Sequence, residues 1–257
     1  MDVLAATGLS LSLSALALWK KALTPGGLVL ACVMCIAITS IGGFAAFAVL
    51  TVTLTGTVAA DHIAGSRADP SGVRRKSGSR DARRVFCNVG IGTIALLLYG
   101  WQRDPVFEIA YYAVMAESLA DSLASKLGPM SEEMPRDIWT GKEIKKGLSG
   151  GVTRWGTFSE VIGAAVVAST MMIWFPSVKT GLLVLSAGFL GAVCDSLFGS
   201  RLQVKYRCTR CGCITEREYH CNIKTEKISG IRWISNDAVN LMSNITALIL
   251  AVLLFQL

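Results

Sequence analysis

Charged side chains are scarce in this sequence. Asp, Glu, Lys and Arg make up 17% of its 257 residues and hydrophobic residues make up 52%, whereas a soluble domain carries about 25% charge. The sequence also lacks a low-complexity tail and a separate soluble domain. These absences exclude an ordinary soluble protein and predict a single integral membrane domain over residues 1–257.

A cleavable signal peptide of the usual kind is absent as well. The N-terminus has no basic segment ahead of its first apolar stretch. That stretch ends at Lys20 and Lys21 without a small-residue cleavage site. We therefore expect the first apolar segment to be retained as a helix.

Eight apolar segments approach the length of a membrane helix, which is about 17–25 residues. They are residues 2–18, 26–42, 44–60, 85–100, 108–127, 158–175, 181–200 and 236–256. The second and third form one run that is too long for an ordinary span, and Gly42-Gly43 is the expected break because glycine accepts the backbone angles of a tight turn. The sequence therefore predicts an all-α fold, a polytopic transmembrane helical bundle of about eight spans.

Positive charge lies almost entirely on one side of these predicted spans. If the N-terminus is outside, the inner connections are residues 19–25, 61–84, 128–157 and 201–235. Of the 25 Lys and Arg residues, only Arg103 and Lys179 then fall on the outer side. Because basic loops face the cytoplasm, we expect a multi-pass protein of the cell membrane with its active side cytoplasmic. The net charge of +7 then reflects contact with anionic membrane lipid, and no nucleic-acid partner is expected.

Acidic residues occur at the inner ends of two predicted spans. Glu117 and Asp121 are four residues apart and share a helix face, and the Asp-Ser-Leu sequence at Asp121 recurs at Asp195. Carboxylates in lipid are costly and face a polar cavity or a partner. Carboxylates from two helices at one depth suit Mg²⁺, which bridges carboxylates to substrate phosphates. The alternative is a structural ion pair with Lys or Arg of a neighbouring helix.

Other polar residues begin the last predicted span or lie inside an earlier one. An N-cap role explains Asn236 or Asp237. It does not explain Asn240, which lies one turn further into the membrane, so Asn236, Asp237 and Asn240 are candidates for the same site, the two amides for binding substrate or nucleotide. Asn88 is an amide within a span, where it needs partners. The basic segment before it, with Arg80, either joins the site or only anchors the topology.

The loop of residues 140–157 combines glycine, lysine and hydroxyl groups and leads into a helix N-terminus. Glycines let backbone N–H groups wrap an anion, lysine neutralises it, and a helix N-terminus favours phosphate. A Walker A sequence is absent, so ordinary P-loop chemistry is not indicated. The alternative is a flexible basic loop that touches anionic lipid. The candidates for phosphate binding are Lys142, Ser149, Gly150, Gly151 and Thr153.

Four of the eight cysteines lie in a basic loop, and the other four lie in apolar segments. A cytosolic loop keeps its thiols reduced. Cys208 and Cys211 form a Cys-x-x-Cys pair and, with Cys221, suit tetrahedral Zn²⁺, for which Cys213 or His220 would be the fourth ligand. Four protein ligands predict a structural zinc site. The alternative is free thiols without a metal.

Several of these segments together resemble a family of integral membrane proteins that was labelled as a domain of unknown function, number 92. The resemblance spans nearly the whole chain, in order. Its pieces are Lys21-Ala-Leu-Thr-Pro-Gly-Gly27, Arg80-Asp-Ala-Arg83 with Asn88, Ala120-Asp-Ser-Leu-Ala-Ser125, Thr140-Gly-Lys142, Leu148-Ser-Gly-Gly-Val-Thr153 with Gly156-Thr157, Asp195-Ser-Leu197 with Gly199, and Asn236-Asp-Ala-Val-Asn240. The cysteine loop is missing from some members, which argues against a catalytic zinc.

This resemblance implies a reaction. The family includes a plant phytyl-phosphate kinase that uses CTP, and it is distantly similar to dolichol kinases and CDP-lipid synthases, which use CTP, Mg²⁺ and acidic residues at the inner surface. It therefore implies a kinase that converts an isoprenoid monophosphate to the diphosphate with CTP or another nucleoside triphosphate. Asp121, Asp195 and Asp237 would be catalytic and bind Mg²⁺. Lys142, Ser149, Gly150 and Gly151 would hold the nucleotide phosphates.

Two other functions remain open at this point. A cytidylyltransferase would attach CMP to a lipid phosphate with the same metal and nucleotide groups. A lipid-phosphate transporter would explain the repeated Asp-Ser-Leu sequence, because transporters often contain internal repeats. The crowding of polar residues at one membrane face disfavours the transporter.

Overall fold

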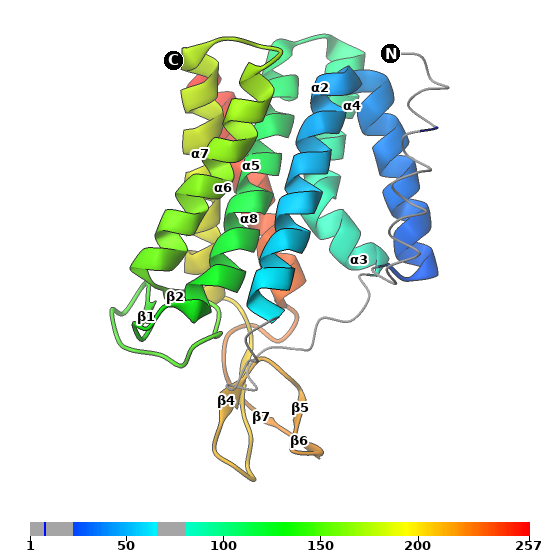
Figure 1. The fold of residues 1–257 in the computed structure, drawn as a ribbon. Helices are drawn as coiled ribbons and strands as arrows, with labels where there is room; N and C mark the ends of the chain where they lie inside the picture. Colours follow the sequence, from blue (N-terminus) through cyan, green and yellow to red (C-terminus); the bar gives the residue numbers. More distant parts are fainter. Residues whose placement is uncertain (1–7, 9–22, 66–80) are drawn as a thin grey trace.

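The computed structural model describes Gly8 and residues 23–65 and 81–257, and these are mostly helical (Figure 1). The helices are α2 (Pro25–Gly65), α3 (Ala82–Val85), α4 (Ile91–Gln102), α5 (Pro105–Leu127), α6 (Arg154–Met172), α7 (Val178–Arg201) and α8 (Asn236–Phe255), with a π-helical turn at Phe86–Gly90 and a 3-10 turn at Gly128–Met130. The predicted span over residues 2–18, apart from Gly8, and the predicted site residue Arg80 lie outside the described residues.

Helix α2 consists of two arms joined by a sharp bend. Gly43, inside it, has φ 65° and ψ −156°, which are not helical angles and which favour glycine. The two arms run in opposite directions on one side of the bundle (Figure 1). The break predicted at Gly42-Gly43 is therefore confirmed.

Four helices within the described residues are long and apolar enough to cross a membrane. They are Pro25–Gly65, Ala82–Gln102, Val178–Arg201 and Asn236–Phe255. The predicted number of eight spans and the outside location of the N-terminus stay predictions. The structure supports the coarser statement that the chain is a mostly helical protein with several candidate spans.

Helix α5 is the centre of the bundle. It contacts α2, α4, α6, α7 and α8, and its residues from Ala110 to Ala120 are all buried. Glu117 lies within this buried stretch and is therefore shielded by other helices, and Asp121, one turn further along α5, is half-buried. This shielding explains how a helix with several charged residues can lie inside an apolar bundle.

Glycines let α6 and α7 approach α5 closely. A β-carbon at Gly163 of α6 would lie 2.7 Å from the backbone of Ala120. A β-carbon at Gly188 of α7 would lie 2.5 Å from the side chain of Ala116. Small residues at such crossings are typical of membrane bundles. The close crossings bring the acidic ends of α5, α6 and α7 next to one another.

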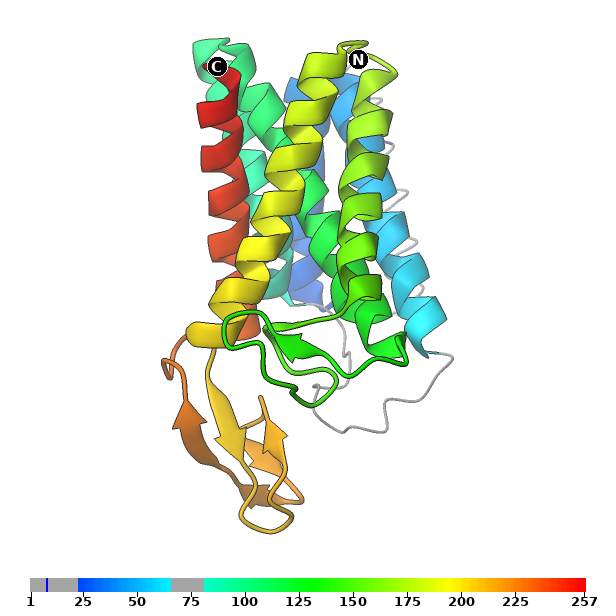
Figure 2. The ribbon, with the colours of Figure 1, turned by 90° about the vertical axis from the view of Figure 1, so that its left-hand side faces the viewer.

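The connection from α5 to α6 and the connection from α7 to α8 lie together at one end of the bundle, and the C-terminus lies at the opposite end (Figures 1 and 2). The connection from α5 to α6 contains β1 (Arg136–Asp137) and β2 (Gly151–Val152), which pair antiparallel. We call this connection, residues 128–153, the cap loop. The prediction of an all-α fold missed these strands, because each contains only two residues and depends on a partner far along the chain.

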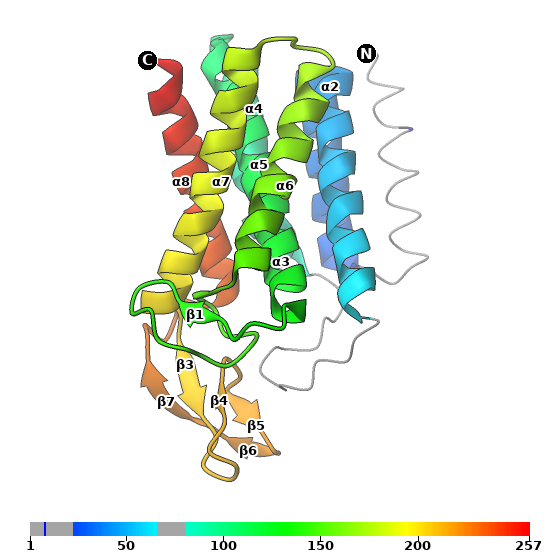
Figure 3. The same cartoon turned by 60° about the vertical axis from the view of Figure 1, so that its left-hand side comes forward.

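The connection from α7 to α8, residues 203–234, projects from the bundle as a small β-structure that we call the finger (Figure 3). Its strands are β3 (Lys205–Arg207), β4 (Ile214–Thr215), β5 (Tyr219–His220), β6 (Ile223–Lys224) and β7 (Glu226–Ser229). They form a sheet of order β4-β3-β7 and a separate β5-β6 hairpin. At the base of the finger, Ile231 N donates a hydrogen bond to Leu202 O and Val204 N donates one to Ile234 O. These bonds fix the finger between the end of α7 and the start of α8.

Candidate functional site

The cap loop is folded around the side chain of Asp137. Its Oδ1 accepts hydrogen bonds from the backbone N–H of Trp139 and Thr140, at 3.2 and 2.8 Å. Its Oδ2 accepts one from Ser200 Oγ of α7, at 2.7 Å. Burial raises the pKa of this carboxyl, but the hydrogen bonds from Ser200 and Thr140 outweigh burial, so the pKa is lower than usual. An ionised Asp137 therefore ties the cap loop to the end of α7.

The backbone of the cap loop packs directly on α7. Gly150 has φ +85°, and a β-carbon there would lie 2.5 Å from Ser200 Cα. On the facing surface, a β-carbon at Gly199 would lie 3.0 Å from the side chain of Ser149. Glycine at position 150 permits both the backbone angle and the close contact. The segment Ser149–Gly151 is thereby held beside the last turns of α7, which carry Asp195.

An open cleft lies where α5, α6, α7 and the cap loop meet. The predicted site residues that line it are Asp121, Ser149, Gly150, Gly151, Thr153, Asp195 and Asn236. The N-terminal turn of α6 also lines it, through Gly156 and Thr157. The structure therefore brings two of the four predicted metal-binding carboxylates, Asp121 and Asp195, into one cleft with most of the predicted phosphate loop.

Thr153 has a clear local role at this cleft. It is the N-cap of α6, and its Oγ1 accepts a hydrogen bond from Gly156 N at 3.0 Å. Because the hydroxyl caps the helix, Thr153 contributes to the site mainly by fixing the N-terminus of α6 against the cleft. That N-terminus carries the positive end of the helix dipole.

Four carboxylates from three helices gather at and beside the cleft: Glu117 and Asp121 of α5, Glu160 of α6 and Asp195 of α7. The charge of Asp121 acts on each of the other three. Ser243 of α8 approaches two of them, with its Oγ 2.6 Å from Glu117 Oε1 and 3.2 Å from Asp195 Oδ2. Carboxylates this close repel one another when ionised, and a divalent cation relieves that repulsion.

Glu160 was missed by reasoning from the sequence alone. It is 4% exposed, lines the cleft and feels the charge of Asp121. A signal was available, since Glu160 is the single acidic residue in the predicted span of residues 158–175. Helix geometry alone did not show that this face of α6 turns towards α5.

The predicted amides form a hydrogen-bonded group next to the carboxylates. Asn240 Nδ2 donates to Asn88 Oδ1 at 3.2 Å, and Asn236 Nδ2 donates to Asn240 Oδ1 at 3.1 Å. Asn88 lies in the π-helical turn and donates to Arg84 O at 2.7 Å. The N-cap of α8 is Ser235. The alternative that Asn236 or Asp237 caps this helix is therefore wrong.

Ion pairs hold two other acidic residues at this end of the bundle. Asp237 Oδ1 lies 3.7 Å from Arg84 Nε, and Asp61 of α2 lies 2.6 Å from Lys126 of α5. Asp237 is not among the residues that line the cleft. The catalytic role of Asp237 therefore stays a prediction. In the structure, Asp237 forms an ion pair with Arg84 beside the cleft.

Lys142 lies on an exposed turn of the cap loop. Gly141, with φ +68°, shapes that turn, and Lys142 O accepts a hydrogen bond from Asp137 N at 2.9 Å. Lys142 is not among the residues that line the cleft. To bind phosphate as predicted, the Lys142 side chain would therefore have to extend from outside the cleft into it.

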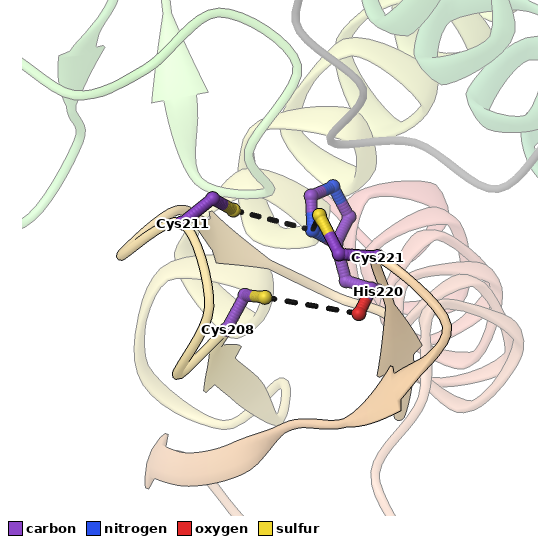
Figure 4. A group of neighbouring side chains, drawn as sticks. All are labelled: Cys208, Cys211, His220 and Cys221. Atoms are coloured by element: carbon purple, nitrogen blue, oxygen red, sulfur yellow. Dashed lines mark hydrogen bonds between the residues drawn. The ribbon is translucent and has the colours of Figure 1, made fainter.

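Four of the five predicted zinc ligands lie together in the finger. The ligand atoms of Cys208, Cys211, His220 and Cys221 all lie within 4.8 Å of one another (Figure 4). Cys213 lies elsewhere, with its Sγ accepting a hydrogen bond from Lys145 Nζ at 2.8 Å. Of the two candidates for the fourth ligand, the structure therefore favours His220.

The chain matches the family model described as "Integral membrane protein DUF92" over residues 8–248. Protein PGR of Arabidopsis thaliana is 28% identical to it over 196 residues, which cover 66% of this chain and 67% of that protein. An uncharacterized membrane protein of Methanocaldococcus jannaschii is 33% identical over 97 residues, which cover 38% of this chain and 41% of that protein. No solved structure matches the chain.

Proposed function

This chain belongs to the integral membrane protein family DUF92, and we propose that it is a membrane-embedded kinase that transfers the γ-phosphate of CTP, or of another nucleoside triphosphate, to an isoprenoid monophosphate such as phytyl phosphate. The observation that carries the proposal is the shared cleft, in which Asp121 and Asp195 face the same space as the segment Ser149–Gly151. Phosphoryl transfer needs positioning and charge neutralisation, and these two groups of residues supply both.

Asp121 and Asp195 would hold the metal. Their carboxylates come from two helices, line the cleft and are the hard oxygen ligands that Mg²⁺ prefers. Glu117 and Glu160 lie beside this pair, and Ser243 Oγ is within hydrogen-bond distance of both Glu117 and Asp195. Mg²⁺, when bound, would neutralise charge on the triphosphate.

The cap loop and α6 would hold the nucleotide phosphates. Gly150 and Gly151 line the cleft, and the N-terminus of α6 lies beside them. Both are favourable places for an anion. In the transfer, an oxygen of the lipid phosphate attacks the γ-phosphorus. The bond from that phosphorus to the β–γ bridging oxygen then breaks, which yields the lipid diphosphate and CDP.

The isoprenoid tail would leave the cleft along α6. Trp155 and Phe158 lie in its first two turns and are 47% and 54% exposed, with ring centroids 5.7 Å apart. They adjoin Gly156 and Thr157, which line the cleft. This aromatic pair offers an apolar path from the cleft towards lipid, and aromatic residues are enriched where the membrane meets water.

The proposal is tested by following labelled phosphate with the purified protein in detergent. CTP labelled in the γ-phosphate, Mg²⁺ and either phytyl, geranylgeranyl or a longer polyprenyl monophosphate would be supplied, and the lipid products would be separated. We expect label in a lipid diphosphate, which no transporter would form. Label that reaches lipid only from α-labelled CTP would instead establish a cytidylyltransferase, and absence of label from both would contradict either transferase.

A further inference from the structure

We propose that Cys208, Cys211, His220 and Cys221 bind one structural Zn²⁺, and that this metal holds the finger in the shape that positions the cap loop. The first half of the proposal stands on the finger alone. The second half rests on the proposed function in one respect, namely that the cap loop binds the nucleotide.

The donor atoms of the four residues lie within 4.8 Å of one another, and two of their distances match a tetrahedral zinc site. His220 Nδ1 lies 3.5 Å from Cys211 Sγ and 3.3 Å from Cys221 Sγ. With zinc–sulfur and zinc–nitrogen bonds of usual length, the edge between these two atom types in a tetrahedron is about 3.5 Å. The four cysteines of the finger are free thiols. Three thiolates and one imidazole are a complete ligand set for a closed, non-catalytic site.

Two tight turns present these ligands to each other. In the first, Gly212 has φ +71° and its N–H donates to Cys208 O at 2.8 Å. In the second, Cys221 and Asn222 have φ 53° and 61° and join β5 to β6 as a two-residue hairpin turn. Figure 4 shows the side chains of the two turns pointing towards one another. The chain therefore adopts strained left-handed angles at non-glycine residues where the ligands meet.

The finger depends on a bound metal for stability because it buries little apolar surface of its own. All four residues of β7 are exposed, and β4, β5 and β6 have two residues each. Small β-structures of this kind rarely bury enough apolar surface to be stable alone, and a metal commonly supplies the missing free energy.

The finger also touches the cap loop at two places. Glu216 Oε1 accepts a hydrogen bond from Ser149 N at 2.7 Å, and Lys145 Nζ donates to Cys213 Sγ at 2.8 Å. Glu216 and Cys213 lie between the ligands Cys211 and His220 in the sequence. A metal that fixes both turns therefore fixes the segment that holds Ser149, whose neighbour Gly150 lines the cleft.

The metal site is tested by measuring zinc in the full-length protein purified in detergent. We expect about one Zn²⁺ per chain and near-complete loss in Cys208→Ser and Cys221→Ser. Cys213→Ser is the matched control and is expected to keep the metal. Because a serine variant can misfold, Co²⁺ exchanged into the unaltered protein provides a second readout, with an intense thiolate-to-cobalt absorption expected. Absence of zinc together with absence of that band would overturn the site, and loss of zinc in Cys213→Ser with retention in His220→Ala would overturn the choice of His220.

The link to the cap loop is tested by amide hydrogen exchange, which needs no activity. Removal of zinc by a chelator is expected to speed exchange at residues 145–151. Glu216→Ala is expected to do the same while zinc stays bound, whereas Glu226→Ala, at an exposed position of β7, leaves exchange there unchanged. Unchanged exchange after zinc removal would overturn the link and leave the metal site standing. A failed kinase assay affects neither readout, so the two proposals fail separately.

Discussion

Asp121→Asn is expected to lower the rate of phosphate transfer from CTP to lipid by about a hundredfold or more, the loss typical when one charge-stabilising group of a phosphoryl or acyl transfer site is removed. Asn has nearly the shape of Asp, so the packing of α5 is kept. It lacks the negative charge that acts on Glu117, Glu160 and Asp195. A neutral amide is also a weaker ligand for Mg²⁺. The measurement is the initial rate of γ-label transfer at saturating CTP.

The same variant is expected to be folded and no less thermostable, because it removes one of several mutually repelling carboxylates. Asp104→Asn is the matched control. Asp104 is the N-cap at the other end of α5, where its Oδ1 accepts from Val106 N at 3.0 Å, and Asn caps a helix as well as Asp does. Asp121→Asn with normal transfer would contradict the assigned role. Equal losses in both variants would also contradict it, since they would point to a general effect on α5.

Gly150→Ala is expected to weaken CTP binding by roughly tenfold or more, since each 1.4 kcal/mol is a factor of about ten in affinity. A non-glycine residue at positive φ costs about 1–2 kcal/mol of folding stability, which by itself does not weaken CTP binding. The added β-carbon would also lie 2.5 Å from Ser200 Cα, which is backbone and cannot turn away. The cap loop must therefore move off α7, away from Asp195. The dissociation constant of CTP, measured with Mg²⁺ present, reports this displacement.

Gly141→Ala is the control that separates the steric clash of residue 150 with Ser200 from the backbone strain of a non-glycine residue at positive φ. Gly141 has φ +68°, yet a β-carbon there meets nothing within 4 Å. It is in the same loop and its substitution carries the same kind of strain, so we expect a small loss of stability and almost unchanged CTP binding. Similar weakening of CTP binding in both variants would contradict a specific role for the contact between Gly150 and α7.

The sequence predicted the parts of this site that local pattern determines. Glu117 and Asp121 share a helix face because of their spacing, and Gly43 marks the bend in α2 because an apolar run of that length needs one. Asp121 and Asp195 lie at corresponding ends of α5 and α7, so their meeting in one cleft follows once both helices end at the same surface.

What the sequence did not predict depends on contacts between distant segments. Glu160 faces the cleft because Gly163 lets α6 press against Ala120, a pairing that periodicity within α6 cannot indicate. The fold of the cap loop depends on the hydrogen bond between Asp137 and Ser200, which are 63 residues apart. The short strands of the finger are equally non-local, because their pairing is set by two turns whose ligand atoms meet in space.

The central claim is that one cleft holds both the metal and the nucleotide, with the metal on Asp121 and Asp195. Its most direct test is the binding of CTP to the purified protein at constant ionic strength, with and without Mg²⁺, for the unaltered chain and for Asp195→Asn. We predict that Mg²⁺ tightens binding to the unaltered chain by at least about tenfold and has almost no effect on binding to Asp195→Asn. An equal effect of Mg²⁺ on both proteins would contradict the claim.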